Sequence, residues 1–185
     1  MKYLKTSKFF LFALTTLTLA SCSNDDSPVN EEEVITTVTT TLTGGGQVIT
    51  LTSRDLDGDG PNAPTVTVSG NLTANTTYAG EVSFLNETVN PAEDITVEVE
   101  EEGVDHQVFY QLPTALGTVA YTDLDLNGKP IGLAFTLTTG NAGTGNLTVT
   151  LRHLPNKSAT GVAAGDITNA GGATDALVTY PVTVN

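Results

Sequence analysis

Two loops of this chain carry oxygen-bearing side chains at every second position, each followed by a glycine. They share the pattern Asp-x-Asp-x-Asp/Asn-Gly, with candidate ligands Asp55, Asp57 and Asp59 in the first loop and Asp123, Asp125 and Asn127 in the second. This spacing is typical of a loop that wraps a calcium ion. Neither loop is an EF-hand, because Val66 and Ala134 stand at the twelfth position, where a bidentate acid is required. Asp-Gly and Asn-Gly are also favoured hairpin turns, so each loop is either a calcium site, completed by ligands from elsewhere in the fold, or a turn alone.

Both histidines of the chain belong to a second group of candidate ligands. Glu98 and Glu102 share a face if their segment is helical, and His106 follows a few residues later. His153 is the only other histidine. A site that joins these four residues would suit zinc, copper or iron, which bind imidazole and carboxylate groups. The alternative is a solvated acidic face that pairs with the basic patch from Arg152 to Lys157.

The single cysteine, Cys22, predicts a lipid anchor. It ends the box Leu19-Ala20-Ser21-Cys22, which follows three lysines and an apolar run over residues 9–19 that is too short to span a bilayer as a mature helix. The box resembles the lipobox of bacterial lipoproteins, in which the cysteine receives a diacylglycerol and becomes the first mature residue. We therefore expect a lipoprotein signal peptide at residues 1–21 and an acylated Cys22. An ordinary secretory signal is the alternative.

The segment after Cys22 predicts a place at the cell surface. Residues 22–33 contain many acids and almost no apolar side chains, so we expect a solvated, lipidated tether. Within it, Ser23-Asn24-Asp25-Asp26-Ser27 resembles the acidic tag of Bacteroidota-type lipoproteins that are exported to the outer face of the outer membrane. The predicted location is the cell outer membrane, lipid-anchored and facing the exterior.

Charge and motifs exclude two classes of function. The 185 residues carry a formal net charge of −14, and three of the seven basic residues lie within residues 1–21, so the mature chain keeps four against 21 acidic residues and a charge of −17. It lacks the clustered Lys and Arg that phosphate contacts need, so we expect no nucleic acid as a partner. We also expect no enzyme, because the sequence has no Gly-x-Ser-x-Gly elbow, phosphate loop or catalytic cysteine.

The elements that must position these residues are strands. Beta-branched and polar residues alternate in nine short runs bounded by turn residues, which predicts an all-β fold: one antiparallel, immunoglobulin-like β-sandwich of eight to nine strands over residues 34–185. The runs cover residues 34–43, 47–52, 65–69, 78–85, 107–112, 118–122, 131–138, 146–154 and 176–184. We expect Val, Ile, Leu and Phe in the core and threonines on the solvated faces.

One segment, residues 91–102, has a mixed pattern. Asn90, Pro91 and Glu93 have the order of a helix cap, a first-turn proline and a capping-box acid. The apolar positions 95, 97 and 99 alternate with polar ones, which is typical of a strand. We expect at most one short helix in the chain, at this segment, with a strand as the alternative.

Most of the chain resembles a family of small surface lipoproteins found with TonB-dependent outer-membrane receptors. The likeness lies in residues 31–37 (EEEVITT), 85–91 (LNETVNP), 106–110 (HQVFY), 149–153 (VTLRH), 155–157 (PNK) and 165–172 (GDITNAGG). Members are sometimes labelled type 1 periplasmic binding fold proteins. That fold alternates strands with long helices over two lobes, so the label conflicts with this sequence as a statement of fold.

The resemblance implies a non-catalytic binding accessory to a TonB-dependent receptor, holding a metal or metal chelate at the cell surface. The alternative is a structural or adhesive sandwich with calcium-stiffened loops. Either function would use calcium or another divalent metal, and no site residue is carried over from the family.

Overall fold

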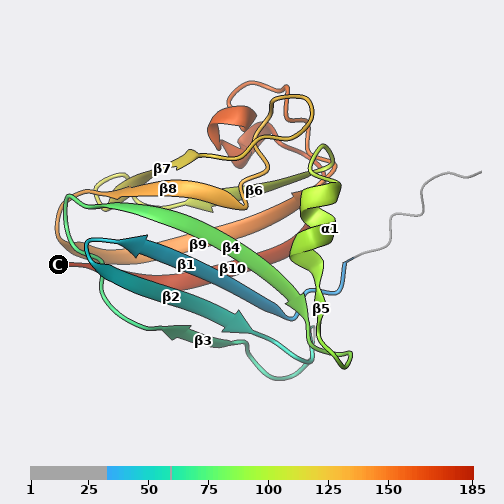
Figure 1. Cartoon of the computed structure of the whole chain (residues 1–185), viewed down its shortest axis with the longest axis horizontal. Helices are drawn as coiled ribbons and strands as arrows, with labels where there is room; N and C mark the ends of the chain where they lie inside the picture. The colour runs from blue at the N-terminus through green and yellow to red at the C-terminus, as the bar shows by residue number, and fades with distance from the viewer. Residues whose placement is uncertain (1–32, 59) are drawn as a thin grey trace, which may run out of the picture. The chain divides into compact units, whose positions relative to one another are not determined.

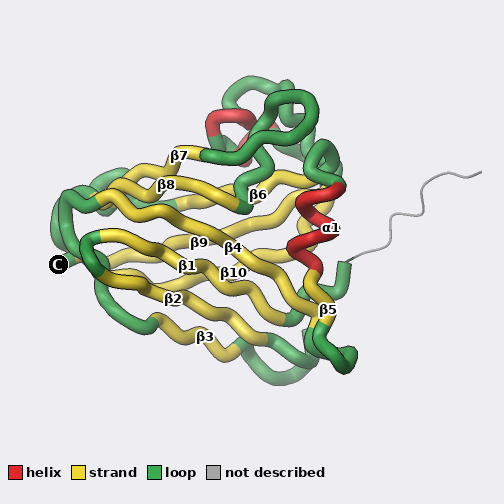
Figure 2. Tube along the Cα trace, viewed as in Figure 1, coloured by secondary structure: helices red, strands yellow, loops and turns green. Residues whose placement is uncertain are grey.

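Ten strands form two antiparallel sheets in the computed structural model, which describes residues 33–58 and 60–185 (Figures 1 and 2). The larger sheet has the order β3-β2-β1-β4-β8-β7, with the short β5 beside β4. Its strands are β1 (Thr37–Gly44), β2 (Gln47–Arg54), β3 (Thr65–Val68), β4 (Thr77–Asn86), β5 (Glu93–Asp94), β7 (Gly117–Tyr121) and β8 (Ala134–Thr139). The smaller sheet has the order β10-β9-β6 and consists of β6 (His106–Gln111), β9 (Gly143–His153) and β10 (Ala173–Val184).

The predicted all-β antiparallel sandwich is confirmed. Each of the nine alternating runs corresponds to one strand, and the tenth strand is the two-residue β5, which is too short to show an alternation. The signal peptide at residues 1–21, the tether up to residue 32 and Asp59 lie outside the described residues. Within the described part of the chain, no helix is long and apolar enough to cross a membrane.

The core lies between the two sheets and is built from alternate strand positions. In β4, Tyr78, Gly80, Val82 and Phe84 are buried, while the residues that alternate with them are exposed or half-buried. Tyr180 of β10 is fully buried too, and its hydroxyl donates a 2.9 Å hydrogen bond to the carbonyl oxygen of Val38 in the other sheet. A buried tyrosine needs such a partner, so this bond lets a large aromatic side chain join the two layers.

A glycine makes room for an aromatic ring where β4 pairs with β8. Gly80 and Phe135 are register partners, and a Cβ atom on Gly80 would lie 2.4 Å from the Phe135 ring. The same ring packs on Tyr110 of the smaller sheet, with ring centroids 4.0 Å apart. Phe135 therefore reaches the opposite layer only because residue 80 has no side chain.

The expected short helix exists, but its predicted start is wrong. Helix α1 runs from Ile95 to Glu101, and its N-cap is Asp94, whose Oδ1 accepts a 3.1 Å hydrogen bond from the N–H of Thr96. The proposed cap, Asn90, lies in the turn before β5. The alternation was misleading because Ile95 and Val99 are buried at the helical spacing of four, whereas Val97 between them is 51% exposed.

Two long segments cover the end of the sandwich next to α1. One is the loop over residues 122–133, and the other, over residues 154–172, contains the 3-10 helices η1 (Val162–Ala164) and η2 (Ile167–Asn169). In Figure 1 both lie beyond β6 and β7, above α1. The segment over residues 154–172 packs on Phe109 of β6, and together with Val162 and Ala170 this forms a small second core.

The chain enters the domain and ends at opposite ends of the sheets (Figure 1). Glu33 lies near the end of α1, because its carboxylate contacts His106, and the C-terminus lies at the other end of the sheets. Asn185 is held there, because its N–H donates to Leu72 and its carbonyl oxygen accepts from Ala74. The connection between β3 and β4 thus pairs with the last residues of β10 in parallel.

Candidate metal centre

Strand pairing brings the two histidines of the chain into contact. His106 is the first residue of β6 and His153 the last of β9, and they are register partners in the antiparallel pair. Their rings are stacked, with centroids 4.7 Å apart and planes inclined by 23°. Residues 47 positions apart in sequence therefore meet at the end of the smaller sheet.

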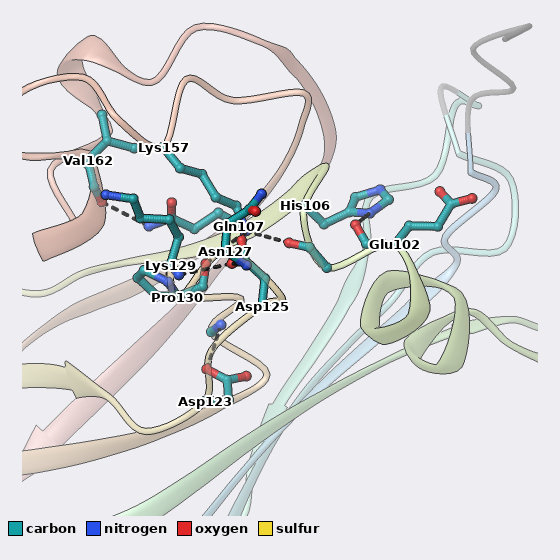
Figure 3. Close-up of polar contacts among 12 residues, drawn as sticks. Glu102, His106, Gln107, Asp123, Asp125, Asn127, Lys129, Pro130, Lys157 and Val162 are labelled. Carbon is teal, nitrogen blue, oxygen red and sulfur yellow. Dashed lines mark hydrogen bonds and ion pairs between the residues drawn. The ribbon is translucent and has the colours of Figure 1, made fainter.

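The buried ring of His106 has a polar contact at each nitrogen. Nδ1 lies 3.2 Å from the carbonyl oxygen of Glu102, just after α1 (Figure 3). A carbonyl only accepts, so Nδ1 carries the proton in this contact. Nε2 lies 2.8 Å from Oε1 of Glu33, whose side chain is 6% exposed. The ring is thus oriented by the backbone on one side and presents Nε2 to a carboxylate on the other.

The charge state of His106 reflects opposing influences. Burial lowers the pKa of the imidazole, but the hydrogen bond and charge of Glu33, the Glu102 carbonyl and the charge of Asp175 raise it, and the net shift is upward. The ion pair with Glu33 therefore favours the imidazolium form.

Carboxylates complete two overlapping groups of candidate metal ligands. One ligand atom from each of His106, His153 and Asp175 lies within 4.8 Å of the others, and the same holds for Glu33, Glu102 and His106. Asp175 occupies the irregularity in the β9–β10 register between Thr174 and Ala176. A bulge of this kind turns a side chain out of the regular alternation, here toward the histidines.

Three of the four predicted transition-metal ligands fall within these two groups, which share His106. Glu102, His106 and His153 all belong to these groups, whereas Glu98 belongs to neither within the described chain. Glu98 is nonetheless close enough to feel the others, because burial and the charges of Glu33, Glu102 and Glu93 raise its pKa.

Sequence reasoning missed Glu33 and Asp175. Glu33 was assigned to the tether as one more acid of a solvated run, although its side chain is buried in the structure. Asp175 directly precedes the predicted run at 176–184 and is the single acidic residue of β10. An acid at the start of an otherwise threonine-rich and apolar strand is the signal that was available for it.

A groove opens beside these carboxylates. It has a volume of about 460 Å³ and lies between the chain that leads into β1 and the first half of β10. Glu33 and Asp175 both line it, and Asp55 lies farther along. The groove gives the metal-ligand groups a route to solvent that the buried His106 ring itself does not have.

The second predicted calcium loop is committed to structural hydrogen bonds. Both carboxylate oxygens of Asp123 accept from the backbone, Oδ1 from Gly132 at 2.8 Å and Oδ2 from Ala134 at 3.0 Å. Oδ1 of Asp125 accepts from the N–H groups of Asn127 and Lys129. Its Oδ2 lies 2.8 Å from the Lys157 ammonium (Figure 3). Asp125 already has a cationic partner in Lys157, and both oxygens of Asp123 are used by the backbone, so the geometry favours the turn alternative for this loop.

The first predicted calcium loop is described only in part. Oδ2 of Asp57 accepts from the backbone and side chain of Asn62, and Oδ1 of Asp55 accepts from the N–H of Asp57. Asp59 lies outside the described residues. The calcium hypothesis for this loop stays a prediction.

Within the described residues, the hydrogen bonds of Lys157 and Arg152 go to partners other than the carboxylates of the acidic run at residues 98–105. Lys157 instead donates to Asp125 and to the carbonyl oxygens of Gly103 and Pro130. Arg152 donates to the carbonyl oxygen of Gly172.

Comparison with known protein families, with curated proteins and with solved structures gives no match.

Proposed function

We propose that this protein is a lipid-anchored lipoprotein on the outer face of the outer membrane. It acts as a non-catalytic binding accessory to a TonB-dependent receptor, and its ligand is a metal or a metal chelate. The observation that supports this best is where the candidate ligands lie. The histidines and their carboxylates gather where the acidic tether joins the domain, at Glu33.

The sequence supports the anchor, and the structure supports the ligand class. The Leu19–Cys22 box provides an acylation point, and lipid anchoring of this kind becomes durable with two or more chains. Imidazole and carboxylate groups suit first-row divalent metals better than calcium, which prefers oxygen ligands alone. A binding accessory needs a ligand site and an anchor, which the candidate metal ligands and the Leu19–Cys22 box would supply without any requirement for catalysis.

Acylation and surface display test the anchor directly. The full chain, expressed in a host with an outer membrane, should incorporate labelled fatty acid, and Cys22→Ala should abolish the label. Protease added to intact cells should remove the wild-type domain while a periplasmic marker survives. Survival of the domain alongside the periplasmic marker would contradict surface exposure, and an unlabelled wild type would contradict the anchor.

Association with a receptor is tested separately. Cross-linking of intact cells should join the wild-type protein to a TonB-dependent receptor of the same membrane, identified by mass spectrometry. Cross-links to soluble proteins alone would contradict the accessory role and leave the anchor unaffected.

A further inference from the structure

We propose that His106, His153, Asp175 and Glu33, here called the histidine site, bind one divalent transition metal of the zinc class, and that the bound ion fastens the tether junction to the smaller sheet. This deepens the proposed function, on which it rests only for the meaning of Glu33 as the end of an anchored tether. The ligand set itself depends only on the geometry of the described residues.

The four side chains come from four different segments. His106 begins β6, His153 ends β9, Asp175 lies at the start of β10, and Glu33 precedes β1. A tetrahedral zinc site has bonds of about 2.0–2.2 Å to nitrogen and oxygen, so neighbouring ligand atoms lie roughly 3.3 Å apart. The atoms of His106, His153 and Asp175 lie within 4.8 Å of one another. Small rotations of these three side chains would bring their atoms to that separation, and Glu33 joins them through its 2.8 Å contact with His106.

Buried polar atoms without partners point to a ligand. Nδ1 of His153 and Oε2 of Glu33 are buried and have no hydrogen-bond partner among the described residues. Leaving such atoms unsatisfied is costly, and an unseen ion is one of the few explanations for a cluster of them. His153 and Glu33 belong to different groups that share His106, so a cation held at His106 is the one position from which both atoms could gain a partner.

His106 is already oriented as a metal ligand. The carbonyl oxygen of Glu102 holds the proton on Nδ1, so a metal ion would displace the second proton of the imidazolium from Nε2, the nitrogen directed at Glu33. Metal-bound histidines typically donate their other ring N–H to a carbonyl or carboxylate in this way. Because Nε2 and the Glu33 carboxylate are 2.8 Å apart, an ion that binds Nε2 also meets Glu33.

If Glu33 binds the ion, the site also holds the end of the tether against the domain. Residue 33 is the first described residue, directly before the chain that leads into β1 of the larger sheet. The other three ligands belong to the smaller sheet. A bound ion would therefore join the two sheets at the point where the tether enters.

Zinc titration of the full chain, purified in detergent, tests this inference. Isothermal titration calorimetry with Zn²⁺ alone should show one ion per chain. His153→Ala and Asp175→Asn should each weaken binding by about 10- to 100-fold or more, in the range seen when metal-site contacts are lost. Glu101→Gln, which removes an acid from the exposed end of α1, serves as the charge-matched control and should change the affinity less than about threefold.

Glu33→Gln separates the tether effect from simple binding. Limited proteolysis at residues 23–36 should slow at least tenfold when Zn²⁺ is added to the wild type, and Glu33→Gln should abolish this protection. Circular dichroism of each metal-free variant checks that the sandwich remains folded. His106 is fully buried, so its replacement is left out of the series.

The zinc titration and the proteolysis test different parts of the proposal. Absence of zinc binding, or equal affinities for the wild type and His153→Ala, overturns the site, and unchanged proteolysis with bound zinc overturns the role of Glu33. Neither result affects fatty-acid labelling or surface display. A protein that binds zinc but carries no lipid would instead overturn the proposed anchor and leave the site standing.

Discussion

The ammonium of Lys157 lies 2.8 Å from the carboxylate of Asp125, and the two side chains are only 6% and 1% exposed. Lys157 also donates to the carbonyl oxygens of Gly103 and Pro130, so its three N–H bonds all have partners. These contacts join the chain after α1, the loop over residues 122–133 and the segment over residues 154–172. One lysine therefore holds together the three irregular segments at that end of the sandwich.

Lys157→Met should destabilise the protein by about 3–5 kcal/mol, because it leaves the Asp125 carboxylate buried without its counter-charge. Urea unfolding measures this loss. Lys129→Met is the matched control: only the backbone of Lys129 contacts Asp125, so the change should stay within about 0.5 kcal/mol. Equal effects of the two substitutions would show that the buried pair has no special role.

The same pair predicts a loss of stability in acid. Burial raises the pKa of Asp125, but Lys157 and the N–H groups of Lys129 and Asn127 lower it by more, so the net shift is downward. The carboxylate thus stabilises the fold above its unfolded pKa of about 3.9, and this contribution disappears as the pH falls through the lower folded value. The difference in free energy of unfolding between wild type and Asp125→Asn should be constant from pH 7 to about 5 and shrink below about 4. A constant difference down to pH 2 would contradict this assignment.

Glu87 should titrate far below an ordinary glutamate. The Arg54 side chain donates to both of its carboxylate oxygens and Thr37 donates a 2.6 Å hydrogen bond, which lowers the pKa of Glu87 to about 2. Carbon-13 NMR of the carboxyl group should give this value. Arg54→Gln should move it toward the ordinary value of about 4.3, and Thr37→Val should move it less. A wild-type pKa near 4.3 would mean that, in solution, water replaces Arg54 as the partner of the Glu87 carboxylate.

Gly80→Ala should destabilise the fold by about 1–3 kcal/mol, because the new methyl group would overlap the Phe135 ring in the core. Thermal or urea unfolding reports the change. Gly70→Ala is a suitable comparison, since its Cβ would meet only the Ile49 side chain, at 3.9 Å. That variant should be neutral or slightly stabilising. If Gly80→Ala unfolds like wild type, the Phe135 ring has room that the structure does not show.

Replacing Asp25 and Asp26 with Ala should hold the protein on the inner side of the outer membrane without changing its stability. Both residues belong to the proposed export tag and precede the folded domain. Protease shaving of intact cells and thermal melts of the purified variant measure the two effects. If protease removes the variant from intact cells at the wild-type rate, export does not depend on Asp25 and Asp26.

The strands could be predicted from the sequence because alternation reports directly which face of a sheet is buried. The same rule failed at Ile95, Val97 and Val99, where positions two apart are apolar but only the pair four apart is buried. Three apolar residues fit both periods, so the start of α1 depended on choosing between Asn90 and Asp94 as the cap. The short β5 follows from its pairing with β4, which no local pattern encodes.

The two histidines of the candidate site could be predicted from the sequence, but the arrangement of the ligands around them could not. His106 and His153 are the only two histidines, so their joint role was a natural hypothesis, and the β6–β9 register places them side by side. Asp175 lies near the histidines because the β9–β10 register shifts at this residue. The Glu33 side chain is buried because it contacts His106, although it lies just before the first strand. Neither is a local property of the sequence. The repeated aspartates at 123 and 125 resembled ligands because hydrogen-bonded turns and calcium loops use the same residues.

Because the Glu33 side chain is held at the tether end of the domain, the length of the tether limits how far Glu33 can lie from the membrane. Cys22 and Glu33 are 11 residues apart, and an extended chain covers at most about 3.6 Å per residue. With the anchor at Cys22, Glu33 can rise no more than roughly 40 Å above the lipid headgroups. The height of a captured ion over the membrane would thus be limited by the reach of the tether, while the sandwich extends from there to the C-terminal end.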